Sequence, residues 1–144
     1  DQAGGSRALR TRNRIAALQA RFGNEVEAER TLQACLAEDP RFLPSYVNLA
    51  SLYLATGRAT AARGVLERAL AVSPDAVLVN LALAETLYRV GDRVAAQRHY
   101  AAVRAAAPEL ALRYSHLASP APSAGRASGA SVEGPLIWDG GPAD

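Results

Sequence analysis

The sequence predicts an all-α fold, a right-handed α-solenoid of stacked antiparallel helix pairs. Three observations predict it: similar residues recur every 34 positions, a glycine divides each period, and a proline closes it. The recurring columns are Gly23, Gly57 and Gly91; Ala28, Ala62 and Ala96; and Pro40, Pro74 and Pro108. A period of this length is typical of helix hairpins that stack, because one hairpin alone cannot bury its apolar stripe.

Composition narrows the function classes. The net charge of +2 is nearly neutral, so no nucleic-acid or membrane footprint stands out overall. All 16 basic residues are Arg, a bias that fits a GC-rich bacterial genome, and bacterial cytoplasm and periplasm both remain open. The single cysteine, Cys35, cannot form an internal disulfide and shares a column with Ala69 and Val103, which predicts a small buried residue. No apolar run approaches the roughly 18–20 residues of a membrane span.

The first helix pair follows a flexible leader, expected over residues 1–8. Apolar residues at helical spacing predict a helix over 9–21, and Gly23 ends it because glycine accepts the left-handed conformation after a helix. A second helix is expected over 25–38, and Pro40 stops it because proline cannot continue the hydrogen-bond ladder.

The second and third pairs repeat this plan. Pro44 falls in a first helical turn, where its missing N–H costs nothing. Turn glycines and stop prolines place the following helices at 59–72, 76–89 and 93–106. The predicted repeats are therefore about 9–42, 43–76 and 77–110, and a short capping helix is expected at about 109–118, cut off by Pro120. Together they form one repeat domain over 9–118.

The composition changes sharply after this domain. The tail, residues 119–144, is rich in Ala, Ser, Pro and Gly, the make-up of a flexible linker. One apolar cluster interrupts it: Leu136, Ile137 and Trp138, followed by Asp139. Trp138 is the single Trp of the chain.

The 34-residue unit resembles the tetratricopeptide repeat. In the middle copy, the family's first-helix aromatic, Leu, small and Tyr positions hold Tyr46, Leu49, Ala50 and Tyr53. Its second-helix Ala, aromatic and Ala positions and its closing Pro hold Ala62, Leu66, Ala69 and Pro74. The first copy departs from the pattern with Arg12 and Gln19, and the third with Asn80 and Leu87. The resemblance covers about residues 9–117 and implies a non-enzymatic module whose first helices line a concave groove for peptides or helices.

The resemblance also assigns the groove residues. The groove is expected to contain Asn13, Ala17, Arg21, Val47, Ser51, Leu54, Leu78, Leu81, Glu85, Tyr88 and Arg89. Val47, Leu54, Leu78, Leu81 and Tyr88 would form an exposed apolar stripe that binds the partner. The alternative is that these side chains pack inside a tightly wound array. The family's clamp for acidic C-terminal peptides is not expected, since Asn48 alone matches it.

Catalytic chemistry is not predicted. His99 and His116 have no carboxylate or Cys at ligand spacing, and the glycines lie in turns or in the tail. We therefore expect no enzyme activity, no cofactor and no metal.

Three binding hypotheses remain. The first is an interaction module that takes an apolar peptide or helix in its concave groove. The second is a self-associating scaffold whose tail fills its own groove or a neighbour's. The third, more distant, is nucleic-acid binding through arginines near the N-terminus: Arg7, Arg10, Arg12, Arg14 and Arg21.

The tail cluster yields one specific prediction. Leu136, Ile137 and Trp138 should dock on the stripe around Val47, Leu54, Leu81 and Tyr88, with Asp139 near Arg89 or Arg21. The alternative is a tail exposed to solvent.

Overall fold

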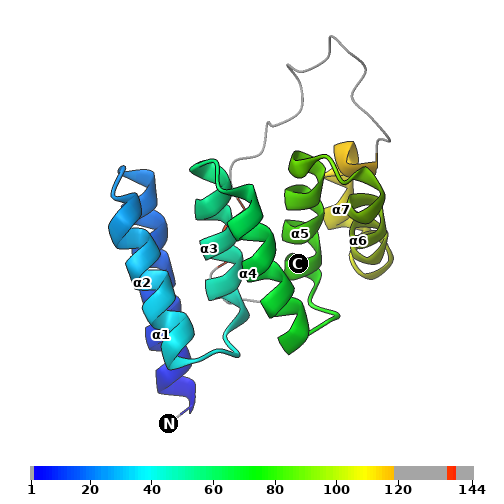
Figure 1. Ribbon diagram of the computed structural model, residues 1–144. Coiled ribbons are helices and arrows are strands. Elements are labelled where there is room, and N and C mark those ends of the chain that lie inside the picture. Colours follow the sequence, from blue (N-terminus) through cyan, green and yellow to red (C-terminus); the bar gives the residue numbers. More distant parts are fainter. Residues whose placement is uncertain (1, 119–135, 139–144) are drawn as a thin grey trace.

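The computed structural model describes residues 2–118 and 136–138 and contains three helix pairs stacked in chain order (Figure 1). Their bounds are α1 Gln2–Arg21, α2 Glu25–Glu38, α3 Leu43–Ala55, α4 Ala59–Val72, α5 Val77–Val90 and α6 Arg93–Ala106. A short helix, α7 Pro108–Leu112, and a 3-10 turn, Ser115–Ala118, cover the end of the stack. The predicted all-α solenoid is confirmed.

The turns between paired helices depend on glycine. Gly23, Gly57 and Gly91 have φ angles of 85°, 77° and 91°, in the left-handed region that side chains with a Cβ rarely adopt. At the third turn, Asp92 also caps α6 by accepting a hydrogen bond from the Ala95 N–H at 3.1 Å. The glycine column therefore reflects backbone geometry rather than packing.

Two expected boundaries are wrong. Helix α1 begins at Gln2, so the expected flexible leader is helical from its second residue. Adding residues to a formed helix is much easier than nucleating one, which allows α1 to run through Gly4 and Gly5. At the other end, the expected capping helix breaks after Leu112.

The break at Leu112 follows the spacing of the buried residues. Ala111, Tyr114 and Leu117 are buried and lie three apart. The Tyr114 and Leu117 N–H groups bond to carbonyls three residues back, at 3.0 Å each. A 3-10 turn has three residues per turn, so it keeps all three side chains on the core side.

Small residues occupy the contacts between helices. Ala28, Ala62 and Ala96 are completely buried, and Cys35 is buried as predicted. Larger apolar side chains from successive helices form a core that continues through the stack. Stability therefore comes from contacts between neighbouring helices, as in other repeat architectures.

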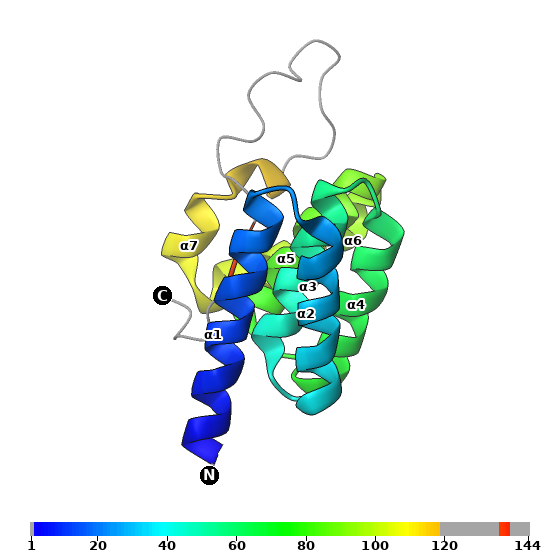
Figure 2. The same ribbon diagram turned by 90° about the vertical axis from the view of Figure 1, so that its left-hand side faces the viewer.

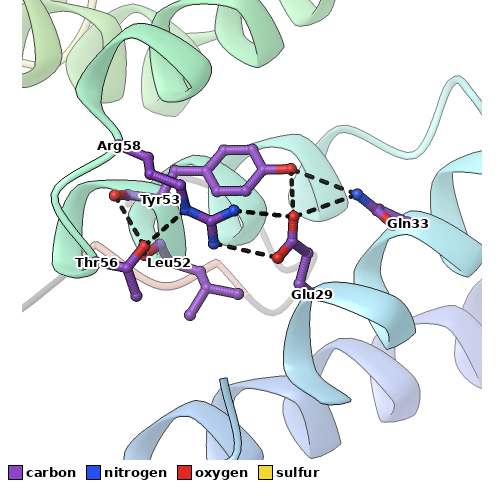
Figure 3. Close-up of polar contacts among 6 residues, drawn as sticks. All are labelled: Glu29, Gln33, Leu52, Tyr53, Thr56 and Arg58. Carbon is purple, nitrogen blue, oxygen red and sulfur yellow. Dashed lines mark hydrogen bonds and ion pairs between the residues drawn. The ribbon is translucent and has the colours of Figure 1, made fainter. Parts of the chain in front are cut away.

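A polar cluster joins the first repeat to the second (Figure 3). Glu29 of α2 accepts hydrogen bonds from Arg58 at 3.1 and 3.2 Å and from the Tyr53 hydroxyl at 2.9 Å. The Arg58 guanidinium also lies 4.4 Å from the centre of the Tyr53 ring. Hydrogen bonds from Arg58 and then from Tyr53 lower the pKa of Glu29. Burial and the bond to Glu29 raise the pKa of Tyr53, so its hydroxyl remains a donor.

This cluster predicts a loss of stability in acid. Because folding lowers the pKa of Glu29, its contribution is present above the unfolded pKa of about 4.3 and disappears as the pH falls through the folded pKa. Glu29→Gln should therefore flatten the fall in unfolding free energy between neutral and acidic pH, measured by urea denaturation. Glu67→Gln, which alters the exposed ion pair with Arg63, is the matched control. An unchanged pH profile for Glu29→Gln would contradict the prediction.

Candidate functional site

A groove lies on the side of the stack formed by the first helices of the pairs. It contains a cavity of about 970 Å³ bordered by residues of α1, α2, α3, α5 and α7 and by segment 136–138. The 90° view in Figure 2 shows this segment, in red, behind α1. Leu136 and Trp138 are half-buried, whereas Ile137 is 54% exposed.

Two side chains of α3 bind the backbone of segment 136–138. The Asn48 side-chain amide donates to the Trp138 carbonyl at 2.8 Å, and its oxygen accepts from the Trp138 N–H at 2.8 Å. One turn later, the Ser51 hydroxyl donates to the Leu136 carbonyl. In an extended chain, polar groups two residues apart point to the same edge. The contacts therefore suit an extended segment that lies along α3.

Asn48 is itself held in place by a neighbouring amide. Its nitrogen donates a second bond to the Asn13 side-chain oxygen at 2.8 Å. Asn13 is 1% exposed and donates to the Leu9 carbonyl at 2.9 Å and to the Ser45 hydroxyl at 3.0 Å. With its amide held this way, the Asn48 side-chain oxygen accepts from the Trp138 N–H, and its nitrogen donates to the Trp138 carbonyl. The site is thus arranged for main-chain groups, which every peptide has.

The side chains of the segment alternate between the core and solvent. Leu136 and Trp138 pack against both buried apolar clusters of the solenoid, while Ile137 belongs to neither cluster, is 54% exposed and borders the cavity. Ile137 therefore does not share the core packing of its two neighbours, because successive side chains of an extended chain face opposite sides. Asp139, predicted to lie near Arg89 or Arg21, is outside the described residues.

The structure brings together five of the predicted groove residues and keeps six apart. Those that border the cavity are Asn13, Ala17, Arg21, Ser51 and Leu78. Val47 and Leu81 are 0% exposed, so their expected exposure is wrong. Helix α3 packs on both α1 and α5, which places these positions between neighbouring first helices rather than on an open face.

The remaining predicted residues lie away from the cavity lining. Leu54 packs against the core, and Glu85 pairs with Arg89 at 3.5 Å. Tyr88 makes an edge contact with His116, with 5.6 Å between ring centres. The apolar stripe expected from the helical spacing is therefore divided between the core and the end cap.

Sequence reasoning missed several residues of the cavity, among them Arg14, Leu18, Leu52, Leu110, Arg113 and Tyr114. It noted Asn48 only as an isolated match to a clamp for acidic peptides. Asn13 and Asn48 lie 35 residues apart, one more than the period, so their pairing could not be found from the columns. The positions of Leu110 in α7 and of Arg113 and Tyr114 just after it depend on where the end helix folds, which the repeat does not determine.

The charge around the cavity is mainly positive. Arg14, Arg21 and Arg113 border it against one carboxylate, Glu25. Elsewhere, burial lowers the pKa of His99, whose ring nitrogen lies 3.0 Å from the Asn80 side-chain oxygen. Within residues 2–118 and 136–138, no group of three or more His, Cys, Asp or Glu side chains is placed to hold a metal. None of the helices that the structure describes has the length and apolar character of a membrane span.

Comparison with known families identifies the fold. A tetratricopeptide repeat model matches residues 19–71 and again residues 53–118. The chain belongs to the tetratricopeptide repeat family. The predicted resemblance is confirmed, and the two matches together span residues 19–118. No curated protein matches the chain at a significant level.

Solved tetratricopeptide repeat structures share this arrangement. The type III secretion chaperone SycD of Yersinia enterocolitica, solved with a peptide of the translocator YopD, has a TM-score of 0.68 at 18% identity over 77% of this chain and 89% of that chain. PcrH of Pseudomonas aeruginosa has a TM-score of 0.69 at 18% identity, over 77% and 89%. The first repeat domain of Spaghetti (RPAP3), bound to the HSP90 peptide SRMEEVD, has a TM-score of 0.66 at 16% identity, over 72% and 82%. At these identities the likeness establishes the fold.

Proposed function

We propose that this tetratricopeptide repeat protein is a non-enzymatic interaction module that binds an extended apolar peptide in its concave groove. The observation that carries the proposal is the set of bonds from Asn48 and Ser51 to the main chain of segment 136–138. These bonds act on groups common to all peptides, while Leu136 and Trp138 fill apolar space at alternate positions. The expected ligand therefore has two large apolar residues separated by one residue.

Similar proteins support a peptide as the ligand. SycD was solved with a translocator peptide, PcrH with the chaperone-binding region of PopD, and the Spaghetti domain with an HSP90 peptide. In this chain, a groove with an existing apolar occupant favours an apolar peptide over an acidic C-terminus. The cavity beside segment 136–138 leaves room for a ligand longer than these three residues.

The second candidate function is self-association through the tail, and the same contacts favour it. The composition of residues 119–135 predicts a flexible spacer, and a flexible chain of about 17 residues has a root-mean-square reach of roughly 23 Å, at 5–6 Å times the square root of its length. That reach suffices for a tail in its own groove or in a neighbour's. A tail in its own groove would compete with an external peptide at every protein concentration.

A peptide titration tests the groove. The double variant Leu136→Ser/Trp138→Ser weakens the internal occupant and removes the single Trp of the chain. A synthetic peptide GPLIWDG then carries the only Trp in the mixture. We expect a saturable blue shift of its emission, because the indole leaves water on binding.

Two control peptides make the test specific. Methylation of the Trp backbone nitrogen removes the donor to Asn48 and should weaken binding about tenfold, the equivalent of one hydrogen bond of about 1.4 kcal/mol. The peptide SRMEEVD should not compete, because the clamp for acidic C-termini is missing. Absence of saturable binding by GPLIWDG, or equal binding of its methylated form, would contradict the proposal.

A further inference from the structure

Helix α1 and the residue that follows it, Phe22, present a second apolar surface, which meets the groove at Leu18. Its residues follow alternating steps of four and three and are all exposed: Gly4, Ala8, Thr11, Ile15, Leu18 and Phe22. The three largest, Ile15, Leu18 and Phe22, are 45%, 52% and 75% exposed. Steps of four and three form a straight seam along a helix, and such a seam packs against another helix. We call this set the α1 seam.

Equivalent positions in later repeats show what covers such a seam. Leu49 and Leu83, in the column of Ile15, are each 2% exposed. Leu52 and Thr86, in the column of Leu18, are 5% and 0% exposed. In the column of Phe22, by contrast, Thr56 is half-buried and Val90 is 42% exposed. Helix α3 packs against α2, and α5 packs against α4, so we infer that a neighbouring helix covers the columns of Ile15 and Leu18 in the later repeats. The same stripe on α1 is therefore suited to a helix.

The charges beside the α1 seam select the kind of helix. Arg7, Arg14 and Arg21 are spaced seven apart and are all exposed, so they form a basic row along one edge of the seam. Helix α1 contains no Asp or Glu, while Arg12 on its other side is paired with Glu38 of α2. A second copy of α1 placed on the seam would bring arginine near arginine. An amphipathic helix with acidic residues beside its apolar stripe would instead place carboxylates against the row.

We propose that the α1 seam binds an acidic amphipathic helix of a partner protein. Ile15, Leu18 and Phe22 would pack against the partner's apolar stripe, and Arg7, Arg14 and Arg21 would pair with its flanking carboxylates. Charges at these flanking positions select partners in helix pairs, in addition to the apolar contact. The interaction does not use Asn48, Ser51 or segment 136–138, but Leu18, Arg14 and Arg21 also border the cavity. Ile15 and Phe22 do not border it, so substitutions at these two residues test the seam separately from the groove.

Two synthetic helices test the proposal on the full chain. Both have about three heptads with Leu at the seam positions; one carries Glu at the flanking positions and the other carries Lys. Labelled and followed by fluorescence anisotropy, the Glu helix should bind saturably and at least tenfold more tightly than the Lys helix. Ile15→Ser/Phe22→Ser should abolish this binding. Neither of these two residues borders the cavity, so the groove is left intact.

Matched controls exclude nonspecific adhesion. Val94 and Leu112 are also large exposed apolar residues, at 75% and 73%, and lie on α6 and α7. Val94→Ser/Leu112→Ser should leave binding unchanged. Hydrogen exchange on the unaltered chain should show that the Glu helix protects α1, a readout that does not depend on any variant.

Several outcomes would overturn the proposal. One is equal binding of both helices, or binding that persists in Ile15→Ser/Phe22→Ser. Another is a concentration-dependent dimer of the chain alone that this variant abolishes, since a second copy would then cover the seam. A third is binding to phosphatidylserine vesicles, but not to the Glu helix, that the same variant abolishes; the seam would then be a membrane contact.

Discussion

Replacing Asn48 with Ala should release segment 136–138 from the groove. The change removes both bonds to Trp138 and also leaves the buried Asn13 oxygen without its donor. Each hydrogen bond contributes about 0.5–1.5 kcal/mol net, so docking should weaken by roughly 1–3 kcal/mol. Trp138 emission reports the release directly because the chain has no other Trp.

The expected readout is a red shift of Trp138 emission and easier quenching by a soluble quencher. Asn80→Ala is the matched control, since it is the same substitution at an amide that bonds to the Pro74 and Ala76 carbonyls, each at 3.0 Å. It should leave the emission of Trp138 unchanged. If Asn48→Ala and the unaltered chain have the same emission and quenching at all protein concentrations, the contacts of segment 136–138 do not persist in solution.

The fold was largely predictable because the repeat carries the same physical constraint three times. The glycine column requires a left-handed backbone, and the proline column stops helices. Four predicted helices, at 25–38, 59–72, 76–89 and 93–106, agree with α2, α4, α5 and α6 to within one residue at each end. The two failures lie at the ends of the array, where no second copy supports the prediction. Residues 2–8 join α1, and α7 ends early because of its own burial pattern.

The site was less predictable because a groove depends on how the helices stack. Helical spacing places Val47 and Ser51 on the same stripe, four residues apart. The structure buries Val47 fully between helices and leaves Ser51 within reach of Leu136. Which of the two residues is buried depends on how the stack of helices curves, and the periodic pattern of the sequence does not specify that curvature. Segment 136–138 was identifiable by composition, but its bonds to Asn48 require the folded chain.

Replacing Leu49 with Ala should cause one of the largest losses of stability of any single substitution in the chain. Leu49 is 2% exposed and lies in α3, which packs against α2, α4 and the neighbouring first helices. A buried Leu→Ala change removes apolar contacts and leaves a cavity, at a cost of about 2–5 kcal/mol. Because repeats stabilise one another through their interfaces, this loss should lower the midpoint of the whole unfolding transition.

Two controls separate burial from the chemistry of the substitution. The first control is Ile15→Ala. Ile15 occupies the position on α1 that is equivalent to Leu49 on α3, but it is 45% exposed. It should cost roughly 1 kcal/mol or less, because half of the side chain already contacts water and Ala favours the helix. Leu112→Ala repeats the Leu49 substitution at a side chain that is 73% exposed and should change stability by about 0.5 kcal/mol or less.

Urea denaturation followed by circular dichroism measures all three variants under the same conditions. The expected order of destabilisation is Leu49→Ala far above Ile15→Ala, with Leu112→Ala close to the unaltered chain. Equal losses for Leu49→Ala and Ile15→Ala would mean that a neighbouring element covers α1 in the isolated chain. The α1 seam would then not be exposed in solution, and the description of α1 as the uncovered first helix of the stack would be wrong.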